Sequence, residues 1–274
     1  MGGDNLRDGF TLVIPFFNEK DFIGATLASL AAQTQPARRL IAVDNGSTDG
    51  SADCVRAFAA ATPDLELTIL CEAVPGKASA LRLGLAAVNT QFVAICDADT
   101  IYPPDYLARA AALLRRDGAV AALAFGVYAG MSPGRAAWTR WKGKAAAALM
   151  PGQAHSGGYG QSFRTEALQA AGGYSPRLWP FTLGDHEVIN RVRRWGAIEY
   201  SAQHFCITSA RRKDRRRVSW SLPERALYHV IPAALKDWFF YDFLAARFRR
   251  RGVAETNLRE RRWEATLSID APAR

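Results

Sequence analysis

The sequence predicts an α/β protein with a mixed, mostly parallel sheet flanked by helices and with a helical C-terminal extension. Four apolar strand patterns alternate with three helical patterns between residues 11 and 99. Crossovers of this length join parallel strands and place helices on the faces of the sheet. The alternation ends after about Ala129, and two further helical patterns follow residue 219. A chain of 274 residues is long enough for one such domain with an appendage.

Composition narrows the class of protein. Hydrophobic residues make up 49% of the chain and aromatic residues 11%, whereas disordered chains are poor in both. The first residues do not show a basic segment followed by an apolar stretch, and no run of 18 apolar residues is present. The four cysteines, Cys54, Cys71, Cys96 and Cys206, are scattered without a CxxC pair. We therefore expect free thiols and a cytoplasmic protein, with any membrane contact peripheral and on the inner face of the membrane. The net charge of +9 favours phosphates, nucleic acid or an anionic membrane as partners.

The first two strand patterns each lead into a polar loop. Residues 11–19 form the first, and the helix that follows, over residues 23–33, has Asp21 as its expected N-cap. Residues 40–44 form the second strand, which runs into the turn-forming run NGSTDGS. A helix is expected next, over about residues 52–61.

The next two strand patterns end in charged residues. A third strand is expected over residues 65–70, and the loop before the next helix ends in Lys77. The fourth, residues 92–99, is apolar over its first five positions and ends in Asp97 and Asp99. An uninterrupted apolar run is typical of a strand buried on both faces.

Polar side chains follow all four strands at their carboxyl ends. Parallel strands bring these ends to one edge of the sheet, where ligands of open α/β folds bind. Amides and carboxylates can bind a base and a ribose, a lysine can bind phosphate, and carboxylates can hold a divalent cation against phosphate. The sequence thus predicts a nucleoside diphosphate site, although each residue alone could be an ordinary turn or surface residue. The residues are Asn18, Glu19, Asp44, Asn45, Ser47, Gly76, Lys77, Asp97 and Asp99.

The chain resembles the family 2 glycosyltransferases of the GT-A fold. The resemblance rests on IPFFNE, VDNGSTDGS, PGKASALRLGL and CDADT, and then on residues 157–174 and 184–196. It implies a GT-A domain over residues 1–212, with residues 213–274 as a basic helical extension. It also implies a metal-dependent hexosyltransferase that uses Mg²⁺ or Mn²⁺ and inverts the sugar of a UDP-sugar or another nucleotide sugar. These motifs are specific for the family rather than for one donor or acceptor.

The same resemblance assigns roles to individual residues. Asp97 would lie near the ribose or the donor sugar, and Asp99 would contact the metal on the diphosphate, with Asp97 as a second candidate ligand. The residues implied to bind the nucleotide sugar are Pro15, Phe16, Asn18, Glu19, Asp44, Asn45, Lys77 and Asp97.

An inverting displacement needs a general base opposite the leaving group, close to the acceptor hydroxyl. Asp185 matches the acidic motif in which the base of this family lies. The family usually has Glu-Asp here, whereas this chain has Gly184 before Asp185, so Glu187 is the alternative base. Asp185 could instead be only the N-cap of the helix expected over residues 186–195.

The middle of the chain, residues 131–161, is less informative. It predicts a helix bearing Trp138 and Trp141, followed by a Gly-rich loop. The loop could close over a donor and exclude water, or it could be a plain surface loop. The tryptophans could stack on a sugar, although aromatic residues that pack a helix are commoner. His155 could contact the acceptor or have no functional role, and the second interpretation is favoured.

A basic run follows the strand expected over residues 198–209. ARRKDRRR contains six basic residues and one acid. Such a run is usually a solvated surface, but similar segments occur in relatives of this family. Arg211 and Arg212 are therefore candidates to bind the diphosphate or an anionic acceptor, because guanidinium groups pair well with phosphate oxygens.

The C-terminal extension combines aromatic and basic residues. One helix is expected over residues 224–230 and another over 232–252, where Trp238 to Phe243 precede four arginines. Such a helix could lie in a membrane interface, which would favour a lipid or lipid-linked glycan as acceptor. It could instead pack back on the catalytic domain.

Three other functions would explain part of the sequence. A sugar-phosphate nucleotidyltransferase would need a GxGxR-type loop where NEKDF stands. A nucleic-acid-binding module would not need carboxylates at each strand end, since they repel phosphate, so no nucleic-acid partner is expected. A nucleotide-sugar binder without catalytic activity fits the missing acid before Asp185.

Overall fold

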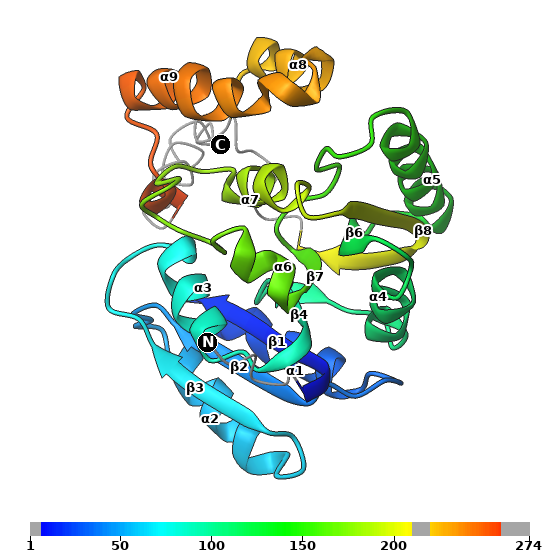
Figure 1. The fold of residues 1–274 in the computed structure, drawn as a ribbon. Helices are drawn as coiled ribbons and strands as arrows, with labels where there is room; N and C mark the ends of the chain where they lie inside the picture. The colour runs from blue at the N-terminus through cyan, green and yellow to red at the C-terminus, as the bar shows by residue number, and fades with distance from the viewer. Residues whose placement is uncertain (1–6, 210–219, 259–274) are drawn as a thin grey trace, which may run out of the picture.

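A computed structural model describes residues 7–209 and 220–258 of the protein (Figure 1). Its described part is built around an eight-stranded sheet with the order β3-β2-β1-β4-β7-β6-β8-β5. The strands are β1 (Arg7–Phe16), β2 (Arg39–Asp44), β3 (Leu67–Cys71), β4 (Thr90–Cys96), β5 (Thr100–Ile101), β6 (Ala119–Tyr128), β7 (Gly160–Arg164) and β8 (Ala197–Thr208).

The helices cover both faces of the sheet. α1, α2 and α4 contribute to one hydrophobic core, and α3, α6 and α7 contribute to the other. The helices are α1 (Lys20–Ala31), α2 (Ser51–Ala61), α3 (Lys77–Ala86), α4 (Tyr106–Leu114), α5 (Pro133–Leu149), α6 (Thr165–Ala170), α7 (Gly184–Val192), α8 (Leu222–Val230) and α9 (Ala245–Arg250).

The first four long strands run in parallel, as predicted. β1 lies between β2 and β4, and β3 pairs with the outer side of β2. The interiors of β1, β2 and β4 are buried, which explains their uninterrupted apolar runs, whereas β3 at the edge of the sheet is only partly buried. Their carboxyl ends therefore meet at one edge of the sheet.

One detail of this half was predicted wrongly. Helix α1 begins at Lys20, with Glu19 rather than Asp21 at the N-cap position. The Glu19 carbonyl accepts a hydrogen bond of 2.9 Å from the Ile23 amide, so the helical hydrogen bonds start before Asp21 is reached. Asp21 lies in the first turn, where a negative charge still favours the helix.

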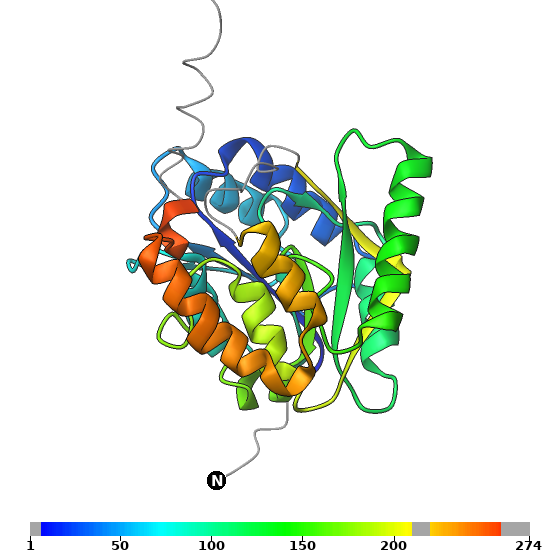
Figure 2. The same cartoon turned by 90° about the horizontal axis from the view of Figure 1, so that it is seen from above.

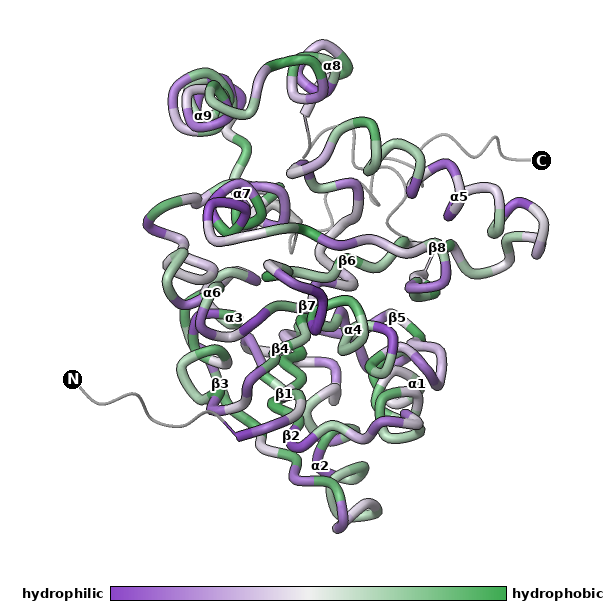
Figure 3. Tube along the Cα trace, turned by 45° about the vertical axis from the view of Figure 1, so that its right-hand side comes forward, coloured by the Kyte–Doolittle hydropathy of each residue, from purple (hydrophilic) through white to green (hydrophobic). Residues whose placement is uncertain are grey.

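The second half makes the sheet mixed. β7 is antiparallel to both β4 and β6, β8 is parallel to β6, and the short β5 is antiparallel to β8. The predicted α/β class, with a mostly parallel sheet flanked by helices, is confirmed. The hydrophobic colouring in Figure 3 is concentrated along the central strands, whereas α5 alternates between hydrophilic and hydrophobic residues at the outside of the molecule.

The C-terminal extension packs back on the sheet domain. Phe239, Phe240 and Phe248 are completely buried, in an aromatic cluster that also contains Trp179 and Phe181. The expected second helix is divided into a 3₁₀ turn η1 (Ala233–Leu235), a π-helix η2 (Trp238–Leu244) and α9. Seen from above, these helices lie across α7 (Figure 2). The expected domain boundary at residue 212 lies outside the described residues.

The cysteines and the helices bear on the expected cellular compartment. All four cysteines are free thiols, as predicted. Among the described residues, none of the helices combines the length and apolar character that a membrane crossing requires.

Candidate functional site

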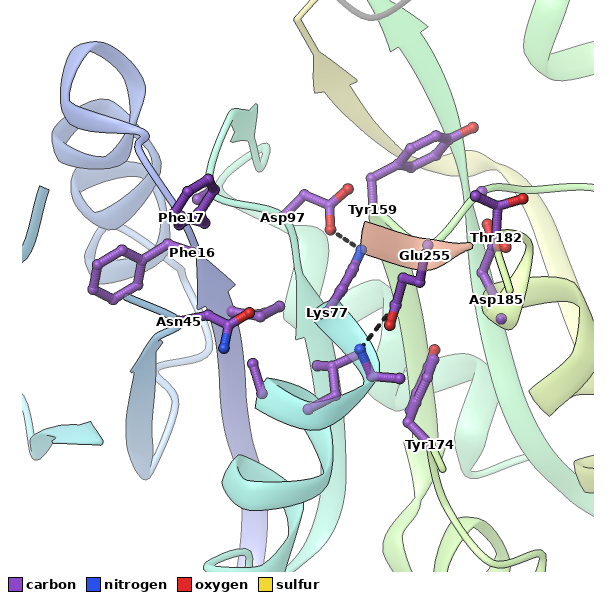
Figure 4. A pocket seen from close by; sticks show the side chains of 18 of the residues that line it. Phe16, Phe17, Asn45, Lys77, Asp97, Tyr159, Tyr174, Thr182, Asp185 and Glu255 are labelled. Atoms are coloured by element: carbon purple, nitrogen blue, oxygen red, sulfur yellow. Dashed lines mark hydrogen bonds and ion pairs between the residues drawn. The ribbon is translucent and has the colours of Figure 1, made fainter. Parts of the chain in front are cut away.

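A pocket opens at the edge of the sheet where β1 and β4 end (Figure 4). Its walls come from the β1 and β4 ends, the start of α3, the loop before β7, and the turn that begins α7. Eight of the predicted residues line it: Pro15, Phe16, Glu19, Asn45, Lys77, Asp97, Asp99 and Asp185. Five of them, Glu19, Asn45, Lys77, Asp97 and Asp99, follow the first four strands and share one pocket, as predicted from the strand ends.

Lys77 and Asp97 form an ion pair inside this pocket, between Nζ and Oδ1. The Asp97 amide donates to the Tyr102 hydroxyl at 2.9 Å, and that hydroxyl donates to the Tyr159 carbonyl at 2.6 Å. Burial raises the pKa of Tyr102 well above its ordinary value, so the hydroxyl keeps its proton. Tyr102 therefore ties the end of β4 to the Gly-rich loop on the opposite wall.

Asp99 lies two residues further along, also on the pocket wall. Its Oδ2 accepts a hydrogen bond of 2.7 Å from the Ser209 hydroxyl, and its carbonyl accepts one of 3.1 Å from the Ser209 amide. Ser209 is the last described residue before the basic run. The predicted ligands Arg211 and Arg212 belong to that run and lie outside the described residues.

The two aspartates suit a cation that arrives with a diphosphate. Within residues 7–209 and 220–258, no cluster of three metal-binding side chains is present. Mg²⁺ in nucleotide sites is commonly held by one or two carboxylates together with substrate phosphates, so a full protein cage is not required. Asp97 and Asp99 therefore fit the expected Mg²⁺ or Mn²⁺, with the phosphate oxygens as the remaining ligands.

Other predicted residues build the edge of the sheet. The Asn45 side chain donates to the carbonyls of Glu72 and Val74 and accepts from the Gly76 amide, each at 2.8 Å. Asn45 thus lines the pocket and also holds the loop that leads to Lys77.

Asn18 and Asp44 lie at the same edge but are not among the residues that line the pocket. The Asn18 Oδ1 accepts from the Thr48 amide at 2.8 Å, and the Asp44 Oδ1 accepts from the Ser47 amide at 2.9 Å. The amide oxygen of Asn18 and the carboxylate oxygen of Asp44 therefore stabilise the turn after β2.

Asp185 lies at the start of α7 and enters the pocket from the wall opposite β4. The N-cap of α7 is Leu183, so the alternative in which Asp185 caps the helix is wrong. Leu183 has φ 66°, a left-handed conformation that non-glycine residues rarely adopt and that is often found at functional sites. This turn directs Asp185 toward the cavity.

Gly158 separates Asp185 from Lys77. A Cβ atom placed on Gly158 would lie 3.1 Å from the Lys77 Nζ and 3.2 Å from the Asp185 Cβ. Glycine lets the loop pass between the two charged side chains, and any larger residue would crowd them.

Glu187, the alternative base, is committed elsewhere. Its side chain is only 2% exposed and makes two hydrogen bonds to Arg191, at 2.7 and 2.8 Å. The Tyr241 hydroxyl also donates to it. Glu187 is not among the pocket residues, so the geometry favours Asp185.

Tyr174 was not singled out from the sequence but lines the pocket. It is buried and donates to the Gln161 Oε1, while the Gln161 Nε2 donates to the Asp185 carbonyl at 3.1 Å. Burial, together with the nearby carboxylates of Asp185 and Asp97, raises the pKa of Tyr174 well above its ordinary value. This hydroxyl therefore stays neutral beside the acidic groups and supports the turn that carries Asp185.

Glu255 is the least expected residue of the pocket. It comes from the short 3₁₀ turn η3 (Glu255–Leu258), and its Oε1 accepts a hydrogen bond of 2.8 Å from the Ala78 amide in the first turn of α3. Its own amide donates to the Pro180 carbonyl at 3.2 Å. Because 177 residues separate Glu255 from Ala78, no local pattern in the sequence could reveal this contact.

Comparison with known proteins places the chain in a family. Residues 11–171, more than half of the chain, match the model for glycosyl transferase family 2. One relative is the undecaprenyl-phosphate 4-deoxy-4-formamido-L-arabinose transferase of Serratia proteamaculans, 34% identical over 103 residues, which cover 36% of this chain and 31% of the relative. Another is the poly-beta-1,6-N-acetyl-D-glucosamine synthase of Staphylococcus epidermidis, 29% identical over 98 residues, which cover 36% of this chain and 23% of the relative. The chain thus matches less than a third of the length of these relatives.

Solved structures share the fold. The mannosyltransferase PcManGT from Pyrobaculum calidifontis, solved with GDP-Man and Mn²⁺, superposes with a TM-score of 0.67 at 23% identity, covering 88% of this chain and 69% of the other. TarS from S. aureus gives a TM-score of 0.60 at 18% identity, covering 88% and 72%. The fold is that of the GT-A glycosyltransferases, as the resemblance implied. With its motifs, its fold and the match over residues 11–171, the chain belongs to glycosyl transferase family 2.

Proposed function

We propose that the protein is an inverting hexosyltransferase that moves a sugar from a nucleotide sugar, most simply a UDP-sugar, to a hydroxyl group of a lipid or lipid-linked glycan. One observation carries the proposal: a single pocket holds the Lys77–Asp97 pair and Asp99 on one wall and Asp185 on the other. This is the arrangement that a displacement needs, with groups for a charged leaving group on one side and a base on the other.

The diphosphate end of the donor would bind at the start of α3. The Lys77 ammonium lies there, and the Ala78 amide in the first turn of α3 already donates to a carboxylate of the pocket, Glu255, so a negative charge is favoured. Phe16, Phe17 and Asn45 line the neighbouring wall, where a nucleoside would find apolar surface and polar groups. GDP-Man and UDP-GlcNAc, bound by two proteins of similar fold, belong to this donor class.

The cation would be held by Asp99 and Asp97 together with phosphate oxygens. When bound, Mg²⁺ or Mn²⁺ would offset the charge that the leaving diphosphate gathers. The hydrogen bond from the Ser209 hydroxyl would fix the orientation of the Asp99 carboxylate for binding the cation. When the donor binds, the Lys77 ammonium would donate hydrogen bonds to the phosphate oxygens as well as to Asp97, because an ammonium group has three N–H donors and can contact both anions.

Asp185 would accept the proton of the acceptor hydroxyl. Its position across the pocket from Lys77 and Asp97 suits attack from the face opposite the leaving group, which inverts the sugar centre. The His186 amide donates a hydrogen bond of 3.1 Å to the Asp185 Oδ1, and the His186 Nδ1 lies 3.1 Å from the same oxygen, so the carboxylate would be held in place.

A lipid acceptor agrees with the outer surface of the C-terminal extension. Its phenylalanines are buried, but Leu222, Val230, Leu235 and Trp238 are between 45% and 83% exposed. An undecaprenyl phosphate is named as acceptor in one relative. We therefore infer a cytoplasmic protein that makes peripheral contact with the inner face of the membrane through this extension.

Calorimetry with a panel of nucleotide sugars, with and without Mn²⁺, tests the donor half of the proposal. One nucleotide sugar should bind, and should bind more tightly with Mn²⁺; failure of the whole panel would contradict the proposal. NMR of the product then tests inversion, since an α-linked donor should give a β-linked product.

A binder without catalytic activity is the second candidate, favoured by Gly184 in place of an acid and by Glu255 inside the pocket. It predicts donor binding with neither transfer nor slow hydrolysis of the donor. Transfer to any acceptor excludes it.

A further inference from the structure

Helix α5 presents an outward face whose composition is unusual for a surface helix. Trp138 and Trp141 are 62% and 59% exposed and their rings stack on each other at 5.4 Å. Leu149, at the end of the same helix, is 82% exposed. With 3.6 residues per turn, Trp138 and Leu149 differ by only about 20° around the helix axis, so both lie on one face.

The opposite face of α5 attaches the helix to the sheet. The Arg140 guanidinium lies 4.2 Å from the centre of the Phe205 ring, and Ala147 is the one buried residue of α5. Gly143 permits close approach, because a Cβ atom there would lie 2.6 Å from the Phe125 ring. The inner face therefore fixes the helix to the sheet, and the exposed tryptophans on the outer face do not take part in this packing.

The charge of α5 has a single sign. The helix carries Arg135, Arg140, Lys142 and Lys144 and no acidic residue. Arg135 and Lys142 lie about 60° and 40° from Trp138 around the axis, on the side away from Trp141, so they border the exposed rings on one side. Tryptophan beside lysine and arginine on one helix face is the pattern of a helix that lies in the interface of an anionic bilayer.

The surface continues onto the C-terminal extension. His155 connects the two, because its Nε2 lies 2.9 Å from the Met150 carbonyl and its ring stacks at 6.2 Å on that of His229. The exposed Leu149 and Val230 are the direct neighbours of these residues in sequence. The ends of α5 and α8 are thus linked through His155, and each end carries an exposed apolar residue. Figure 2 shows α5 at the outer edge of the molecule.

We propose that the outer face of α5, formed by Arg135, Trp138, Trp141, Lys142 and Leu149, is a docking surface for anionic lipid bilayers. Its charge complements acidic lipid headgroups, and its indole rings and leucine can enter the interface below them. Since the chain runs directly from Leu149 to Gly157 and Gly158 in the pocket wall, docking through α5 would hold the acceptor side of the pocket near the bilayer. The surface is separate from the pocket and does not depend on the proposed reaction.

Co-sedimentation of the full chain with phosphatidylcholine vesicles, with and without phosphatidylglycerol, tests this proposal. The protein should bind the mixed vesicles, bind pure phosphatidylcholine vesicles more weakly, and dissociate as salt is raised. The double variant Trp138→Ala/Trp141→Ala should lose about tenfold or more in partitioning, because both rings leave the interface. Lys142→Glu should lower partitioning onto the mixed vesicles about tenfold, through the change of charge alone. This variant tests the proposal if the double variant does not fold.

Trp195→Ala is the matched control, since Trp195 is 55% exposed at the end of α7, on another element. It should partition like the unaltered protein. Equal binding by the double variant, or no binding of mixed vesicles at all, would overturn the proposal. So would a concentration-dependent dimer that the double variant abolishes, because a second copy would then cover this face. Donor calorimetry on the same variants separates failure of docking from failure of the proposed reaction.

Discussion

The Glu255 carboxylate accepts a hydrogen bond of 2.8 Å from the Ala78 amide, one residue after Lys77 and inside the pocket. A negative side chain thus occupies the positive end of α3, where the proposed diphosphate would also bind. A carbon atom added to Gly76 would approach the second Glu255 oxygen to 2.8 Å, so the turn before Lys77 also fits closely around this carboxylate.

Glu255→Gln should therefore strengthen binding of a nucleoside diphosphate by about fivefold, because it removes a charge that competes with the phosphates. Calorimetry with the diphosphate and Mn²⁺ measures this. Glu166→Gln is the control, since Glu166 is an exposed glutamate in the first turn of α6. Weaker binding by Glu255→Gln would mean that the carboxylate contacts the donor instead of competing with it.

Lys77→Met should weaken donor binding by about tenfold or more, since it removes the ammonium next to the proposed phosphate position and breaks the ion pair with Asp97. Lys144→Met, on an exposed position of α5, should leave donor affinity unchanged. Calorimetric titration of both variants with the same nucleotide sugar measures these affinities. Equal affinities would remove Lys77 from the proposed site.

Asp185→Asn should reduce the transfer rate by about 10²–10⁴-fold while donor affinity stays the same, because a general base acts on the acceptor and not on the donor. Single-turnover transfer and calorimetry provide the two readouts. Glu187→Gln should behave differently, lowering the free energy of unfolding by about 3 kcal/mol through loss of a buried ion pair with Arg191. If instead Glu187→Gln retains full stability and loses transfer, the assignment of the base is wrong.

His204 should make the protein less stable in acid. Its ring is completely buried, packs at 4.7 Å on Tyr106 and has no hydrogen-bond partner among the described residues. Burial, reinforced by the Arg109 charge, lowers the pKa of His204 to about 3. The unfolded chain, with an ordinary histidine, binds one more proton between about pH 6.5 and pH 3, so stability falls with falling pH in that window by up to about 1.4 kcal/mol per unit.

Denaturant unfolding at pH 7.5 and pH 5.5 tests this contribution. The loss of stability between the two pH values should be smaller in His204→Phe than in the unaltered protein, since the phenyl ring cannot take up a proton. Identical losses would show that another group is responsible.

Much of the first half of the fold could be predicted because its signals are local. The apolar run of β4 and the polar residues that follow it are contiguous in sequence, and parallel connectivity then places Lys77, Asp97 and Asp99 at one edge. The resemblance to the family added Asp185, which lies opposite them.

The remaining features depend on contacts between distant segments. The order in which β7, β6 and β8 continue the sheet follows from long-range pairing that no short motif encodes. Asn18 and Asp44 each have a side-chain oxygen that accepts from a backbone amide of the turn after β2, a contact that their residue types alone do not reveal, and their roles in binding stay predictions. Glu255 is polar and carries no motif, so only the folded chain reveals it.

The aromatic cluster shared by Trp179, Phe181, Phe240 and Phe248 makes the turn that carries Asp185 dependent on the far end of the chain. Melting of the C-terminal helices should therefore coincide with melting of the turn that carries Asp185, in one cooperative transition. A shortened protein that ends before Phe239 would keep every family motif and still lack the support that holds the proposed base in position.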